Sequence, residues 1–175
     1  VVTTRDVLAT ASGQLEITGA GSIRSMSRNV ELTANTGGGA DLIIGGNVSG
    51  NHVLFRLADN DAIDDGENIL LNTDLNNLNA GGAYRFVTTN AGQDVVLGDG
   101  AFGISTLNGD IVVDADIVND PAALSSSLEI DAGAGDVTLQ AITLSVQGTV
   151  QGAGIEELGL RVASSGVTTL NGNIV

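Results

Sequence analysis

Short apolar runs recur along the whole chain, and each has the alternation of a β-strand. Runs such as 15–17, 42–44, 95–97 and 137–139 carry aliphatic residues at their first and third positions. Because successive side chains of a strand point to opposite faces, these residues lie on one face. The runs begin about 7 to 16 residues apart, and Gly, Asn, Asp and Ser fill the intervals with turn-forming sequence. The pattern predicts a repeated all-β array.

No segment has the pattern of a long helix. The best candidate for helical structure is a single turn at 121–124, where Asp120 would be the cap and Pro121 the first helical position. A bulging loop is the alternative interpretation of the same residues.

The composition favours a thin core. The chain of 175 residues has three Phe, one Tyr and no Trp, together with 25 Gly. Aromatic side chains dominate ordinary cores because each buries a large area, so here Val, Ile, Leu and Ala must replace them. A β-solenoid, in which opposing backbones lie close together, has such a core. A β-sandwich is the alternative, since Asn-Gly at 108–109 and 171–172 is also a hairpin turn.

The sequence is similar to itself in two places. Residues 103–112 and 166–175 are identical at seven of ten positions, with an offset of 63 residues. If this offset represents three stacked coils, each coil has about 21 residues and the chain forms roughly eight coils. Residues 1–175 are then a single solenoid segment. A further recurring feature is an Asp immediately before an apolar run, as at Asp94 and Asp136.

Residues 127–139, followed by 166–174, resemble the degenerate repeats of very large bacterial exoproteins, the filamentous-haemagglutinin-like and autotransporter-like adhesins. The resemblance is clear over about 90–175. It implies a right-handed parallel β-helix, secretion to the bacterial cell surface, and an adhesive or structural role. The Asn-Pro-type secretion motifs of the amino-terminal domain of such proteins are absent, because the only proline follows Asp120. We therefore expect an internal segment, or a shorter relative that assembles by itself.

The charge excludes several classes of function. The formal net charge is −15, and all six basic residues are Arg. Such a chain repels polyphosphate, so we expect no nucleic-acid partner. It also has no basic amphipathic stretch and no run of about 20 apolar residues, so we expect no membrane insertion. The absence of Cys excludes a disulfide scaffold and a thiolate metal site.

An acidic loop at 59–68 is the strongest candidate for a binding site. Carboxylate, amide and carbonyl oxygens are the ligands that calcium prefers, and the loop is dense in all three. Its candidate ligands are Asp59, Asp61, Asp64, Asp65 and Glu67. No other cofactor is expected, and a solvated loop without calcium is the alternative.

Two further segments resemble calcium sites more weakly. One is the acidic cluster of Asp110, Asp114, Asp116 and Asp120, where Asp114 and Asp116 share a face of the strand pattern. The other is 36–43, which partly matches a nonapeptide calcium repeat but occurs once, so we interpret it as a turn.

A catalytic site is poorly supported, and we expect no enzyme. His52 is the only histidine, and no nucleophile-elbow motif surrounds any serine, so a surface turn is the better interpretation of His52. Arg85, between Tyr84 and Phe86, is the only basic residue with aromatic neighbours, and it alternates with them as in an ordinary strand.

These observations lead to one expected function and two alternatives. Strand-like sequence at both ends, 2–4 and 173–175, suggests either a cut from a longer solenoid or copies that stack head to tail into a filament. We expect a non-enzymatic extracellular β-solenoid that associates with neighbouring repeats or further copies, with a host or matrix surface as a further candidate partner. The alternatives are a carbohydrate-active β-helix enzyme and a calcium-stabilised binding module.

Overall fold

The computed structural model describes residues 1–36, 41–59, 66–90, 92–123, 126–140, 142–143 and 159–172. Every strand pair in these ranges is parallel, and the regular elements there are all β-strands. The predicted β-solenoid is therefore confirmed. The sandwich alternative is wrong, because Asn108 and Gly109 form a corner between two strands of different sheets and not a hairpin. Asn108 has a left-handed φ of 66° at this corner.

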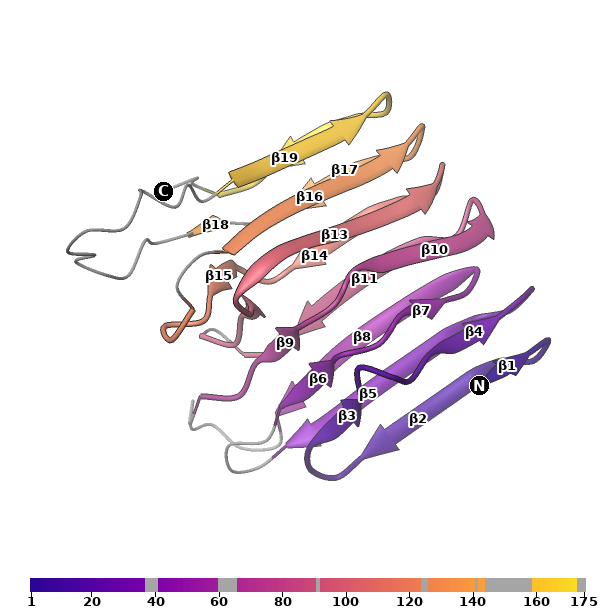
Figure 1. Cartoon of the computed structure of the whole chain (residues 1–175), viewed down its shortest axis with the longest axis horizontal. Coiled ribbons are helices and arrows are strands. Elements are labelled where there is room, and N and C mark those ends of the chain that lie inside the picture. Colours follow the sequence, from indigo (N-terminus) through magenta and orange to yellow (C-terminus); the bar gives the residue numbers. More distant parts are fainter. Residues whose placement is uncertain are drawn as a thin grey trace.

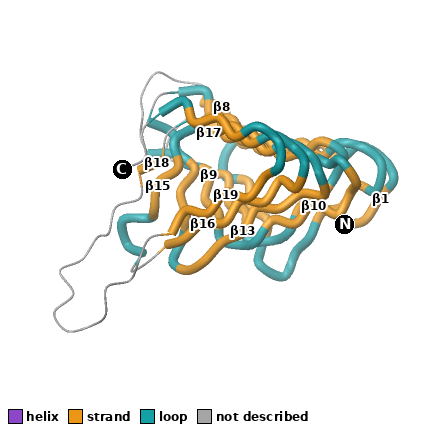
Figure 2. The backbone as a smooth tube through the Cα atoms, turned by 90° about the horizontal axis from the view of Figure 1, so that it is seen from above, coloured by secondary structure: helices purple, strands orange, loops and turns teal. Residues whose placement is uncertain are grey.

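Each coil passes over three faces of the solenoid (Figures 1 and 2). On the first face, a three-stranded sheet is followed by a four-stranded sheet, with β10 beside β7. Its strands are β1 (Val2–Thr3), β4 (Ile23–Ser25) and β7 (Val48–Ser49), then β10 (Leu75–Ala80), β13 (Gly100–Leu107), β16 (Ser126–Gly133) and β19 (Gly159–Ser164).

The second face is one long sheet. Its seven strands are β2 (Val7–Ala11), β5 (Val30–Thr36), β8 (His52–Asp59), β11 (Ala83–Thr88), β14 (Ile111–Asp114), β17 (Val137–Leu139) and β20 (Thr168–Leu170). The third face has six short strands: β3 (Leu15–Ile17), β6 (Leu42–Ile44), β9 (Ile69–Leu71), β12 (Val95–Leu97), β15 (Ile117–Asn119) and β18 (Ile142–Thr143). The first strands lie at one end of the stack and β19 at the other (Figure 1).

The coils are fewer and longer than the sequence suggested. The longest sheet has seven strands, which is fewer than the roughly eight coils expected. Residues that pair along it, from Val7 to Thr168, follow one another at intervals of 23, 23, 31, 27, 26 and 31 residues. The similar stretches at 103–112 and 166–175 do not stack, because Gly103 lies in β13 of the first face and Thr168 in β20 of the second. The 63-residue offset is therefore not a whole number of coils.

The core is the thin aliphatic one that the composition predicted. Its fully buried side chains are mostly Leu, Ile and Val from the three faces. Three of the four aromatic residues also lie there: Phe55, Tyr84 and Phe86 pack together, with 4.9 Å between the ring centroids of Phe55 and Phe86. The Tyr84 hydroxyl donates a hydrogen bond to the Val48 carbonyl at 2.6 Å. Aromatic area is thus concentrated in two neighbouring coils.

A column of glycines forms the corner that leads into the second face. Gly82, Gly109, Gly135 and Gly166 lie in successive coils, and each packs against the carbonyl of the glycine below it. A Cβ added to Gly82 would lie 2.5 Å from the Gly50 oxygen, and one added to Gly109 would overlap the Gly82 oxygen. Only glycine permits this approach of backbones, which explains part of the high glycine content.

The segment after β15 makes a hydrogen-bonded turn that Asp120 caps, but none of its described residues is helical. The Asp120 carboxylate accepts a hydrogen bond from Ala122 N at 2.7 Å, and Ala123 N donates to the Asp120 carbonyl at 2.9 Å. Leu124 lies outside the described residues.

Candidate functional site

Most of the predicted calcium loop falls where the structure gives no description. Asp61, Asp64 and Asp65 lie outside the described residues, and so does the side chain of Asp59 at the end of β8. Of the predicted ligands only Glu67 is fully described, and its side chain is completely buried. The calcium site therefore remains a prediction. Half of the turn at 36–43, residues 37–40, also lies outside the described residues.

Glu67 has a carboxylate neighbour that the sequence did not reveal. Burial raises the pKa of Asp41 above its ordinary value, the hydrogen bond from Asn68 N lowers it, and the nearby charge of Glu67 raises it. The Asp41 Oδ1 atom accepts that hydrogen bond at 2.9 Å. Asp41 and Asn68 lie in successive coils, immediately before β6 and β9, so the coil stacking itself brings the two acids together.

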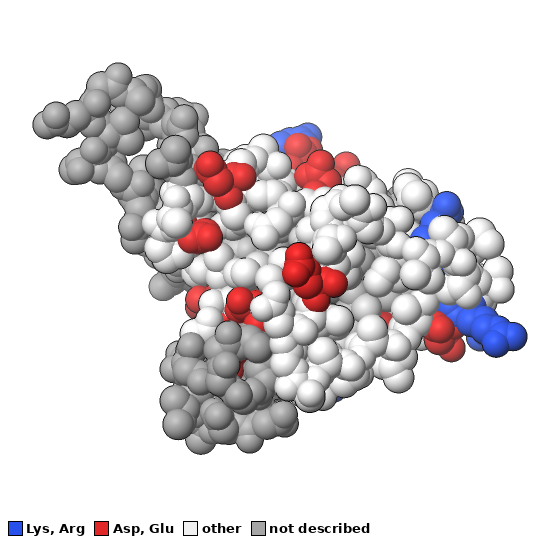
Figure 3. Space-filling model, turned by 60° about the horizontal axis from the view of Figure 1, so that its bottom comes forward, with Lys and Arg blue, Asp and Glu red and all other residues white. Residues whose placement is uncertain are grey.

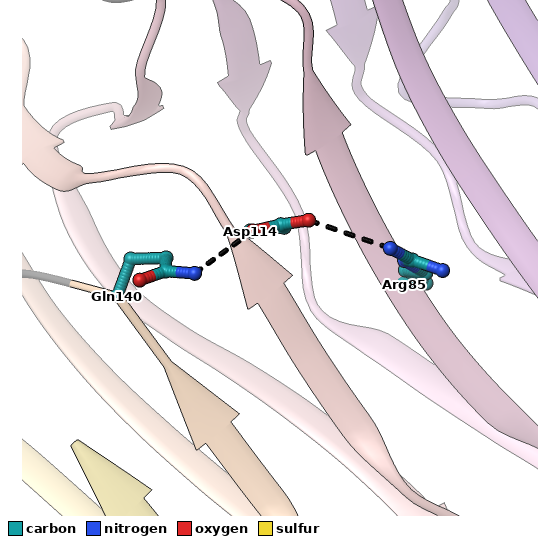
Figure 4. A network of polar contacts seen from close by, with 3 residues as sticks. All are labelled: Arg85, Asp114 and Gln140. Atoms are coloured by element: carbon teal, nitrogen blue, oxygen red, sulfur yellow. Dashed lines mark hydrogen bonds and ion pairs between the residues drawn. The ribbon is translucent and has the colours of Figure 1, made fainter. Parts of the chain in front are cut away.

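The fold keeps only part of the second acidic cluster together, because Asp114 and Asp116 line one hollow while Asp110 and Asp120 lie elsewhere. Asp110 accepts a hydrogen bond from Asp136 N, and Asp120 from Ala122 N, at different corners of the solenoid. Asp114 binds two side chains of neighbouring coils, Arg85 at 3.3 Å and Gln140 at 2.8 Å (Figure 4). Among the described residues, no three His, Cys, Asp or Glu side chains are grouped so that they could hold a metal ion.

The recurring Asp and Asn residues before strands have a role that the sequence analysis missed. The side-chain oxygen of one coil accepts a hydrogen bond from a backbone N–H of the next coil, so the side chains join coils at their corners. These bonds are Asp6 to Asn29 N, Asp41 to Asn68 N, Asn68 to Asp94 N, Asp110 to Asp136 N and Asp136 to Val167 N, at 2.8–3.0 Å. The Asp-before-strand pattern was the available signal for this role.

A groove on the second face has a mostly apolar lining that two arginines and one histidine border. It has a volume of about 440 Å³ and lies between β8 and β11, lined by His52, Val53, Leu54, Arg56, Ala83, Tyr84, Arg85 and Val87. His52 is exposed, as predicted, but it is the first residue of β8 and does not lie in a turn, so that part of the prediction is wrong. Arg85 is exposed between the buried Tyr84 and Phe86, which confirms the predicted alternation.

Nothing in the sequence combines His52, Arg56 and Arg85 into one site. Period-two alternation places His52, Leu54 and Arg56 on the outer side of β8, and this was readable from the sequence. That β11 is the neighbour of β8 was not readable, because 31 residues separate the paired residues Val53 and Tyr84.

Negative charge is distributed unevenly along the chain. Residues 1–59 contain five acidic residues and four of the six Arg, whereas the remainder contains sixteen acidic residues and two Arg. In Figure 3 the basic side chains lie near the margins of the visible face and the acidic ones are spread across it.

Comparison with protein-family models, with curated proteins and with solved structures found no significant match. Within the residues that the structure describes, no helix has the length and apolar character needed to cross a bilayer.

Proposed function

We propose that the chain is a non-enzymatic extracellular structural or adhesive β-solenoid of a bacterial cell surface. It serves either as a segment of a large surface protein or as a subunit that stacks head to tail. The observation that carries this proposal is the second face, where the seven strands from β2 to β20 pair in parallel without interruption. Their hydrogen bonds form a continuous ladder along the long axis of the solenoid. A ladder of this kind is a stiff spacer that can present a surface at a distance.

The edges of the described stack also support association along the axis. On β2, the side chain of Ala9 lies in the same inward-facing row as Leu32 and Phe55, but it has a neighbouring coil on one side only. At the other end, Leu170 of β20 continues the inward row of Leu139 and is 42% exposed. Strand edges of this kind pair with further strands, supplied either by adjoining coils of the same protein or by another copy.

The surroundings of the only histidine favour the non-enzymatic proposal over a catalytic one. In the described part of the chain, His52 makes no hydrogen bond with a serine or a carboxylate. A general base of the usual type would need such a partner to orient it.

Electron microscopy and sedimentation of the purified chain, with calcium and with a chelator, test the head-to-tail version. We expect unbranched rods whose length grows with protein concentration. Ala9→Lys should shorten them, because it places a charge on the inward row at the open edge. Leu8→Lys, on the outward side of the same strand, is the matched control and should leave the rods unchanged.

Each version can be contradicted separately. Monomers at every concentration, with and without calcium, would overturn stacking by this chain and leave the segment version. Turnover of an acidic polysaccharide that is lost in Asp114→Ala would overturn the non-enzymatic proposal. A melting temperature that rises with calcium, and no longer does so in Asp61→Ala, would identify the calcium-stabilised module.

A further inference from the structure

The groove on the second face is built by the register of two strands. Outward side chains of β8 and β11 pair as His52 with Ala83, Leu54 with Arg85, and Arg56 with Val87. His52 and Arg56 each lie beside a smaller side chain, and Leu54 lies beside the cationic Arg85. The small side chains of Ala83 and Val87 leave the space that the groove occupies.

Two guanidinium groups border this space. Arg56 and Arg85 lie on neighbouring strands, one pleat apart along the strand direction, and both are exposed. Adjacent parallel strands are about 4.8 Å apart and residues i and i+2 about 6.6 Å apart, so two flexible Arg side chains can reach one shared anion. Planar guanidinium groups bind carboxylates through paired hydrogen bonds.

The two arginines differ in their partners. Arg85 is ion-paired to Asp114 at 3.3 Å, with both side chains largely exposed to solvent. In the described part of the chain Arg56 has no ion pair, and its neighbour on β5 is Thr33. One further carboxylate, Glu31, lies on β5 beside Leu54. Arg56 is therefore the cation that is most available to a ligand, and Arg85 must be shared.

The rest of the lining is mostly apolar. Leu54, Ala83 and Val87 are half-buried on the outer face, and Val53 and Tyr84 lie beneath them. A volume of about 440 Å³ falls in the usual range for small-molecule sites. All eight lining residues belong to the described part of the chain.

We propose that this groove binds a small monocarboxylate with an apolar body. The carboxylate lies between Arg56 and Arg85, and the apolar body covers Leu54 on one side of the two cations. The net charge of −15 repels ligands that carry several negative charges. A ligand with one negative charge, paired by arginine, is repelled less. The site goes beyond the proposed scaffold role and does not depend on it.

Titration of the ¹⁵N-labelled protein with benzoate, followed by NMR, tests the proposal. Shifts should be largest at backbone amides of β8 and β11 and should saturate. Benzamide, which has the same shape without the charge, should bind at least about tenfold more weakly. Inorganic phosphate should also bind more weakly than benzoate, because it carries more negative charge. Equal binding of benzoate and benzamide would overturn the proposal.

Three substitutions define the role of each charge. Arg56→Gln should weaken benzoate binding at least about tenfold. Asp114→Asn should strengthen it, because it releases Arg85 from its ion pair. Arg161→Gln, an exposed Arg paired with Glu129 on another face, is the matched control and should leave binding unchanged. An unchanged affinity in Arg56→Gln, with a native spectrum, would show that the groove is not the site.

Discussion

At the scale of residues, Tyr84 and Asp41 are withdrawn from solvent and hydrogen-bonded to the backbone of a neighbouring coil, and this burial governs their titration. Tyr84 is almost fully buried, and its hydroxyl donates to the Val48 carbonyl. Asp41 and Glu67 place two carboxyl groups near one corner of low exposure. In both cases a residue that bonds a neighbouring coil should make the stability of the fold depend on pH.

The single tyrosine should remain protonated in the folded protein at strongly alkaline pH. Burial raises the pKa of Tyr84 well above its ordinary value of 10.0, so only the unfolded chain releases the phenolic proton readily. The contribution of Tyr84 to the free energy of unfolding should therefore be constant below about pH 10 and fall as the pH rises above it. Tyrosinate absorbance during alkaline titration measures this, since the chain has one Tyr and no Trp.

Tyr84→Phe is the control for this prediction. It should cost about 1–2 kcal/mol at neutral pH, because the Val48 carbonyl loses its donor, and it should remove the alkaline decline attributed to Tyr84. Tyrosinate absorbance that appears near pH 10 in the wild-type protein, while circular dichroism remains native, would contradict the buried position.

Asp41→Asn should stabilise the protein at neutral pH. The raised pKa means that the folded state favours the protonated form, so the charged form destabilises it as the pH rises through the folded pKa. An amide oxygen can still accept from Asn68 N without the charge, as Asn68 itself does from Asp94 N. We expect a higher melting temperature at pH 7 and no gain below about pH 3, where the carboxyl is neutral.

Asp110→Asn is the matched control, because Asp110 accepts an equivalent bond from Asp136 N but is exposed. Its melting temperature should change less than that of Asp41→Asn. A lower melting temperature for Asp41→Asn at neutral pH would indicate that the carboxylate at this corner is favourable.

At the scale of elements, the corners decide how closely the strands stack. At the corner between the first and second faces, the column of glycines leaves no room for a Cβ between successive coils. The backbones of successive coils are therefore in direct contact there. Asp side chains join the same coils at this corner, and Asp41 does so at the corner that leads into the third face. Short strands of three residues, such as β12, can therefore remain in register although each has few hydrogen bonds of its own.

Gly109→Ala should strongly destabilise the protein. The added Cβ would overlap the Gly82 carbonyl, which belongs to the backbone and cannot move alone. We expect a loss of at least about 2 kcal/mol, or roughly 4–8 °C in melting temperature for a chain of this size. Gly13→Ala is the matched control, because its Cβ would meet nothing within 4 Å, and its melting temperature should be unchanged or slightly raised. Equal melting temperatures for the two variants would show that the coils are not closely stacked at Gly109.

At the scale of the whole molecule, the charge opposes the compact state. The excess of acidic residues lies mainly after residue 59 of the sequence. Hydrogen bonds at the corners hold several of these carboxylates at fixed spacings along the axis. Their mutual repulsion destabilises the folded chain, and burial of the apolar core must offset it.

Monovalent salt should therefore raise the melting temperature. Increasing NaCl from about 0.01 to 0.15 M shortens the Debye length from about 30 to 8 Å and screens repulsion between coils. Differential scanning calorimetry at the two concentrations measures the change. A buffer series at the same constant pH without added NaCl serves as the control. A melting temperature that falls with salt would indicate that favourable ion pairs outweigh the repulsion.

The sequence by itself determined the fold class, because period-two runs, scarce aromatics and frequent glycine are local properties of the chain. The inward positions of Leu32, Tyr84 and Ile111 could be assigned from their own neighbours in sequence. The length of each coil could not, since insertions at corners change the interval between paired residues from 23 to 31 without changing any strand pattern. The tertiary structure alone therefore decided which strands are neighbours. Through that choice it brought Arg56 beside Arg85 and Asp41 near Glu67, and it separated the similar stretches at 103–112 and 166–175.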